Sequence, residues 1–140
     1  MDYYTQIFKR KSFHIFKSTD TLSGDEIQEL KDFIKNVKPL DSEIKTEICI
    51  VPEKESTCKR GGEFCILFYS ETKDEYLQNI GYIGEQIDLY LASKNIGALL
   101  QYKIIEHLLR PSVYIIQIGI EFTFGLQSVI GGFSARFKII

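Results

Sequence analysis

The longest helical pattern in the sequence, from Asp74 to Asn95, is the strongest constraint on the fold. Apolar side chains recur along one side at spacings of three and four residues: Leu77, Ile80, Ile83, Ile87, Tyr90 and Leu91. Acidic residues stand at the N-terminal end, where the helix dipole favours them, and Asn95-Ile96-Gly97 is the expected exit. Gly81 and Gly84 are costly inside a helix unless another backbone or a flat ligand approaches closely. We therefore expect this helix to be central.

Three shorter helices are expected on either side of it. One covers Asp2 to Arg10, where apolar residues have helical spacing. Another begins at the capping box Ser23-Gly24-Asp25-Glu26, continues to Val37 and is stopped by Pro39. The third, short and amphipathic, runs from Ile104 to Arg110 and ends at Pro111.

Segments rich in β-branched and aromatic residues predict the strands of a mostly antiparallel sheet. They lie at 47–51, 63–69, 112–122 and 133–140. The polar link from Pro52 to Gly62 favours a hairpin between the first two strands. Its Lys59-Arg60-Gly61-Gly62 is not a nucleotide phosphate loop, since that motif leads into a helix and here a strand follows. The overall expectation is an α+β fold, with helices flanking the sheet and the long helix at its centre.

Composition limits the classes of protein to consider. The 140 residues fit a single domain spanning 1–140, but one short for enclosing a large cofactor unaided, so a second subunit is plausible. The formal charge of −2 gives no reason to expect nucleic acid or a membrane as partner. Three cysteines without a Cys-x-x-Cys pair disfavour a disulfide framework and a metal site, and fit the cytoplasm.

A basic and aromatic stretch from Phe8 to Phe16 is the candidate ligand site. Lys9, Arg10 and Lys11 supply positive charge, the guanidinium can offer a forked donor pair, and Ser12 and His14 can add hydrogen bonds. This set of groups suits a phosphate. Three phenylalanines, Phe8, Phe13 and Phe16, are expected to anchor the stretch in the core. The alternative is a basic helix end lying on the surface, because helix dipoles favour cations there.

The same stretch resembles a family motif. Arg10-Lys11-Ser12, followed by His14 and Phe16, is similar to the opening Arg-Arg/His-Ser-x-Arg/Lys-x-Phe of the FMN-dependent nitroreductase-like flavoproteins. The resemblance implies that these residues hold the FMN phosphate and ribityl chain. His14 departs from the motif, which usually has Arg or Lys at that position.

A second resemblance lies in the long helix and the strand before it. The stretch from Asn79 to Gly97 looks like the family's core helix at the dimer centre, with matches in kind and order at Gly81 or Gly84, Gln86, Leu89, Ala92 and Gly97. The strand at 64–70 is similar to the one that leads into that helix. The likeness covers about the first hundred residues and is closest to a small, divergent clostridial-type branch.

Beyond Gly97 the sequence departs from the family pattern. The family continues into a glycine-containing loop near the flavin, commonly with Trp, whereas 98–103 contains neither residue. The domain is therefore expected to be divergent or incomplete after about residue 97. In the family, a Lys/Arg pair after the last core strand adds to phosphate binding. Arg136 and Lys138 could take that role, although alternating charges on an edge strand usually face solvent.

The resemblance implies an FMN-dependent oxidoreductase that passes electrons from NAD(P)H to a nitroaromatic, quinone or similar flat acceptor, and that works as a homodimer. The flavin supplies the redox chemistry, so no catalytic acid or base is expected. A flavin-free, non-catalytic binding protein on the same scaffold is the alternative, because the divergent part falls where the family lines its cofactor. A hydrolase is disfavoured, since His14 and His107 have no recognisable nucleophile motif beside them.

Overall fold

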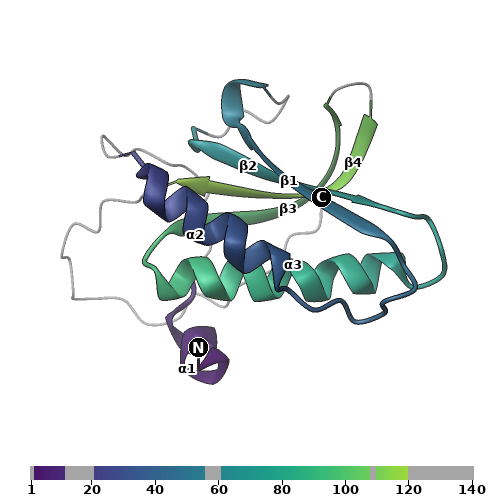
Figure 1. The fold of residues 1–140 in the computed structure, drawn as a ribbon, viewed down its shortest axis with the longest axis horizontal. Coiled ribbons are helices and arrows are strands. Elements are labelled where there is room, and N and C mark those ends of the chain that lie inside the picture. Colours follow the sequence, from purple (N-terminus) through teal and green to yellow (C-terminus); the bar gives the residue numbers. More distant parts are fainter. Residues whose placement is uncertain (1, 12–20, 56–60, 108–109, 120–140) are drawn as a thin grey trace, which may run out of the picture.

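The computed structural model describes residues 2–11, 21–55, 61–107 and 110–119, with side chains placed as far as residue 100 (Figure 1). In chain order, the elements are α1 (Tyr3–Lys9), α2 (Gly24–Lys35), β1 (Thr46–Pro52), the 3-10 turn η1 (Glu53–Glu55), β2 (Phe64–Ser70), α3 (Tyr76–Ser93), β3 (Gly97–His107) and β4 (Arg110–Gly119). The predicted α+β class is confirmed, with α3 as the long central helix.

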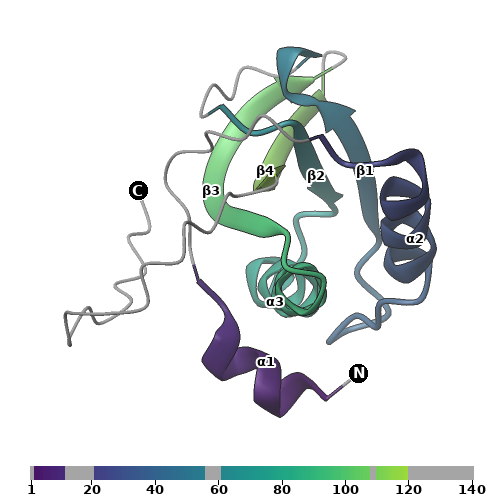
Figure 2. The same ribbon diagram turned by 90° about the vertical axis from the view of Figure 1, so that its left-hand side faces the viewer.

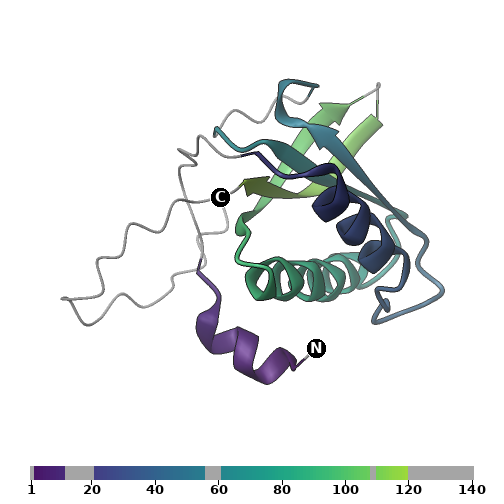
Figure 3. The ribbon, with the colours of Figure 1, turned by 60° about the vertical axis from the view of Figure 1, so that its left-hand side comes forward.

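The strands form one sheet in the order β1-β2-β4-β3, and every pairing is antiparallel. The register is fixed at the centre by isoleucines, with Ile66 opposite Ile50 on one side and Ile116 on the other. Figure 2 shows the layers: the curved sheet lies over α3, α2 lies beside β1, and α1 lies on the far side of α3 from the sheet. Figure 3 shows the same separation of α1 from the strands.

The core lies between the sheet and the two longer helices. Ile66 and Phe68 of β2 point into it and are fully buried, together with Leu30 of α2 and the isoleucine stripe of α3. The other face of β2 contributes Cys65 and Leu67 to a second, smaller buried cluster. Burial on both faces explains why β2 is an almost continuous apolar run, not an alternating one.

The helix ends follow local sequence signals closely. The Ser23 hydroxyl accepts from the Glu26 N–H, and the Glu26 carboxylate accepts from the Ser23 N–H, so the predicted capping box is present. At the end of α3, Asn95 takes a left-handed conformation with φ 59°. The Asn95 N–H donates to the Ala92 carbonyl, and the Ile96 N–H donates to the Leu91 carbonyl. These two hydrogen bonds make a Schellman motif.

The prediction of a helix from Ile104 to Arg110 was wrong. Residues 97–107 are strand β3, which pairs with β4 through most of its length. Tertiary pairing overrode a short helical pattern. Pro111 is the second residue of β4 and does not end a helix. It is tolerated because β2 pairs with β4 only at residues 114–118, so Pro111 lies where β3 is the neighbouring strand.

Two buried or half-buried amides on α3 hold the loop that follows α2. Asn79, fully buried, accepts from the N–H groups of Leu40 and Asp41 at 2.8 and 3.0 Å. Gln86 donates to the Lys38 carbonyl at 2.8 Å. The loop therefore takes its position from α3, whose long apolar side is already fixed by the sheet.

Replacing Asn79 with Ala should lower the free energy of unfolding by about 1–3 kcal/mol, because two backbone N–H groups lose their acceptor. Urea denaturation measures this loss. Gln78→Ala is the matched control, since Gln78 is an exposed neighbour on the same helix, and it should change stability by less than about 0.5 kcal/mol. Equal losses in the two variants would contradict the assigned role of Asn79.

Candidate functional site

The described part of the basic stretch lies where α1 ends against α3. Arg10 is the C-cap residue of α1, and its N–H donates to the Gln6 carbonyl at 2.9 Å. Its side chain then crosses to α3, 78 residues away in the sequence. The basic segment is thus attached to the central helix through Arg10.

A buried ion pair makes this connection. The Arg10 Nε donates to Asp88 Oδ2, and the Glu85 carboxylate lies 3.9 Å from the same nitrogen. Glu85 and Asp88 are three residues apart on α3, so both carboxylates lie on the helix face that meets α1. The side chains of Arg10 and Asp88 are only 13% and 3% exposed. The guanidinium is therefore held mostly out of solvent.

Burial dominates the electrostatics of the two carboxyls. It raises the pKa of Asp88 above its ordinary value, and the neighbouring Arg10 charge and hydrogen bond oppose that rise. Burial also raises the pKa of Glu85, which Arg10 lowers and the Asp88 charge raises further. The ionised form of Asp88 is therefore costly to keep in this place without the guanidinium beside it.

An open cavity of about 210 Å³ adjoins the ion pair between α1 and α3. Its lining is mostly apolar and aromatic, from Tyr3, Tyr82, Glu85, Gln86 and Leu89. Pockets that enclose a drug-sized ligand measure roughly 300–1,000 Å³. The cavity formed by the described residues is thus smaller than a cofactor such as a flavin nucleotide needs.

The structure describes only two of the six predicted cofactor-binding residues. Arg10 lies in the site, and Lys11 is exposed next to it. Ser12, His14, Arg136 and Lys138 lie outside the described residues. Their role in binding stays a prediction.

The expectation that phenylalanines anchor the stretch was wrong for Phe8. Its side chain is 73% exposed, and α1 has no buried residue. The apolar side of α1 faces away from the core, because the helix is fastened to α3 through Arg10. The other two phenylalanines, Phe13 and Phe16, lie outside the described residues.

Sequence reasoning missed Asp88 and Glu85. Helical periodicity gives no signal for Asp88, because it lies outside the apolar stripe, on the face of α3 that meets α1, and its burial appears only in the folded structure. Buried carboxylates need a partner, and Arg10 supplies it here. Glu85, which is half exposed, carries no sequence signal either.

Within the described ranges, none of the helices combines the length and apolar character needed to cross a bilayer. The same residues contain no group of three or more His, Cys, Asp or Glu side chains able to hold a metal ion.

Replacing Arg10 with Met should cost about 3–5 kcal/mol at neutral pH, because the Asp88 carboxylate stays buried without its partner. Without Arg10, the folded-state pKa of Asp88 rises further above its ordinary 3.8. A carboxyl with a raised folded-state pKa loses stabilisation as pH rises through that pKa, so the deficit should shrink at acidic pH. Urea unfolding from about pH 4 to about pH 8 measures it.

The double variant Arg10→Met with Asp88→Leu is the control, since it removes both charges and should recover most of the loss. A deficit in Arg10→Met that is the same at every pH would contradict the assignment.

Comparisons with known proteins place this chain in a family. The family model described as "Putative TM nitroreductase" matches residues 2–119, which is most of the chain. No curated protein matches the chain significantly.

Solved structures share the fold at low sequence identity. A nitroreductase with bound FMN from Bacteroides fragilis is 10% identical, with a TM-score of 0.70 over 100% of this chain and 99% of that one. A nitroreductase family protein from Clostridium novyi is 15% identical, with a TM-score of 0.61 and 86% of each chain covered. A Thermotoga maritima protein described as a "putative nitroreductase" is 22% identical, with a TM-score of 0.58 over 88% of this chain. The chain spans 50% of the length of that protein. With a family model matched from residue 2 to residue 119 and this shared fold, the chain belongs to the nitroreductase family.

Proposed function

We propose that the chain is an FMN-dependent oxidoreductase that takes electrons from NAD(P)H and passes them to a nitroaromatic, quinone or similar flat acceptor. The observation that carries the proposal is the family match over residues 2–119. The FMN in the Bacteroides fragilis structure and the anchored basic segment at Arg10 add support. The donor and the acceptor are part of the proposal.

The groups beside α3 fit a phosphate-bearing cofactor chemically. The Arg10 guanidinium supplies a positive charge beside α3, and the exposed Lys11 adds a second one next to it. Ser12 and His14 would complete the phosphate contacts, with Arg136 and Lys138 as further candidates. When bound, FMN would supply the electron-transfer chemistry, and the chain would hold its phosphate and orient its ring.

We propose that the working form is a homodimer. The small cavity of the described residues needs a further wall to enclose a flavin, and the outer side of α1 exposes Tyr4, Ile7 and Phe8. On α3, a Cβ added to Gly81 would meet no atom within 4 Å in the described part of the chain. A second copy would cover this apolar surface and could bring the close backbone approach expected at that glycine. We also propose a cytoplasmic location, which three cysteines without a Cys-x-x-Cys pair fit.

The proposed cofactor site predicts a flavin absorbance spectrum for protein purified or reconstituted with FMN, and a quinone-dependent oxidation of NADH or NADPH.

Lys11→Ala should weaken FMN binding by about 1.5 kcal/mol, roughly tenfold in Kd, while the binding of riboflavin, which has no phosphate, is nearly unaffected. Lys11 is the cleaner position to change, because Arg10 also stabilises the fold. Lys31→Ala, on α2, is the control for loss of an exposed lysine.

Flavin fluorescence quenching gives both dissociation constants. A folded, colourless protein that cannot be reconstituted with FMN would refute this function and favour the flavin-free binding protein.

The proposed dimer predicts that Phe8→Glu shifts the protein from dimer to monomer, because a charge would have to be buried in the apolar contact. Sedimentation velocity at micromolar concentration measures this shift. Lys31→Glu introduces an acid on α2 and should leave the dimer intact. A wild-type protein that is monomeric under these conditions would refute the proposal.

A further inference from the structure

We propose that the open cavity between α1 and α3 binds a small organic cation, of the class of the primary arylalkylamines. The ammonium group would lie beside the Glu85 carboxylate, and the flat ring beside Tyr3 and Tyr82. The cavity volume of about 210 Å³ suits a ligand of this size, well below that of a nucleotide. The proposed flavin chemistry does not require such a site, so the inference stands apart from the proposed function.

The first support is the balance of charge where α1 meets α3. Glu85 and Asp88 are two carboxylates on one face of the helix, and Arg10 is the only cation that the described chain pairs with either of them. Asp88 accepts the hydrogen bond from the Arg10 Nε, whereas Glu85 lies 3.9 Å from that nitrogen, too far for a hydrogen bond. The contact therefore carries one negative charge in excess when both carboxyls are ionised.

The second support is the state of Glu85, the carboxylate that lines the cavity. Within the described part of the chain, no hydrogen-bond donor contacts it, although its side chain is only half exposed. Burial raises the pKa of Glu85, and the Asp88 charge raises it further, so the ionised form is poorly stabilised there. A ligand with a positive charge and N–H donors would supply what this carboxylate lacks.

The third support is the remaining lining, which explains why the cation should be organic. Tyr3 and Tyr82 contribute aromatic rings, and the faces of such rings attract cations and stack on flat groups. The Gln86 amide already donates to two backbone carbonyls, which leaves Glu85 as the charged group for recognition. A metal ion would need several oxygen ligands, and this lining offers a single carboxylate.

The test uses benzylamine, a flat ring with one ammonium group at neutral pH, and benzyl alcohol, its neutral counterpart of nearly the same shape. Both are titrated into the whole chain and followed by NMR chemical shifts. Wild-type protein should bind benzylamine with a Kd of about 0.1–1 mM, and benzyl alcohol about tenfold more weakly. Glu85→Gln should remove this difference. Tyr82→Leu should weaken benzylamine binding by about threefold to tenfold, through loss of the cation–π contact.

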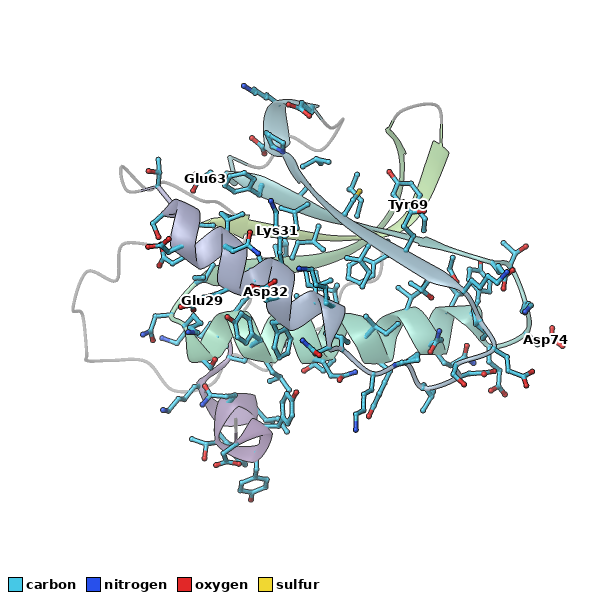
Figure 4. The ribbon with its side chains drawn as sticks, viewed as in Figure 1. Glu29, Lys31, Asp32, Glu63, Tyr69 and Asp74 are labelled. Atoms are coloured by element: carbon cyan, nitrogen blue, oxygen red, sulfur yellow. The ribbon has the colours of Figure 1, made fainter. Side chains whose placement is uncertain are left out.

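Asp74→Asn is the control. It removes an acid just before the start of α3, where Figure 4 shows the side chain pointing away from the protein, and it should leave both affinities unchanged. Glu85→Gln keeps the shape of the side chain and breaks no hydrogen bond of the described chain, so it should fold, and Tyr82→Leu tests the site independently.

Three outcomes would each overturn the inference: wild-type protein that shows no saturable binding of benzylamine, equal affinities for the two probes, or a preference that survives Glu85→Gln. None of these outcomes depends on whether FMN binds. The cation site and the proposed function can therefore fail separately.

Discussion

The buried pair of Arg10 and Asp88 is the interaction on which the placement of the N-terminal region depends. It joins the end of α1 to the middle of α3 across 78 residues of sequence. The main core of the described fold is formed by apolar packing between α3, α2 and one face of the sheet. α1 takes no part in that core; it lies against α3, where Arg10 pairs with Asp88 and Tyr3 lines the small cavity. The same arginine is the first anchor of the basic segment.

This arrangement gives the central helix two different sides. The side facing the sheet is closed by isoleucines and carries no chemistry. The side facing α1 holds the carboxylates of Glu85 and Asp88. Next to Glu85 it forms a small open cavity with Tyr3 of α1. Because the chain belongs to the nitroreductase family, the side facing α1 is the candidate for cofactor binding. A flavin enzyme of the proposed kind needs only to hold its cofactor and leave one ring face accessible.

Local signals in the sequence were enough for much of the fold. The isoleucine stripe of α3, the capping box at Ser23 and the hairpin of β1 and β2 each depend on residues close together in the chain, and all three are present. Strand β3 was missed because its conformation is set by pairing with β4. Where a segment satisfies its backbone by pairing with another strand, its own periodicity is a poor guide.

The candidate site, too, could be predicted only in part from the sequence. A cationic cluster is visible in the sequence at Arg10, but its partner on α3 is defined only by the folded structure.

The attachment of α1 has a kinetic consequence as well. A helix without a buried side chain can open at a free energy far below that of the whole domain, so its amide hydrogens should exchange with water while the core stays protected. Such local opening offers a route by which a bulky ligand could enter and leave without unfolding the sheet.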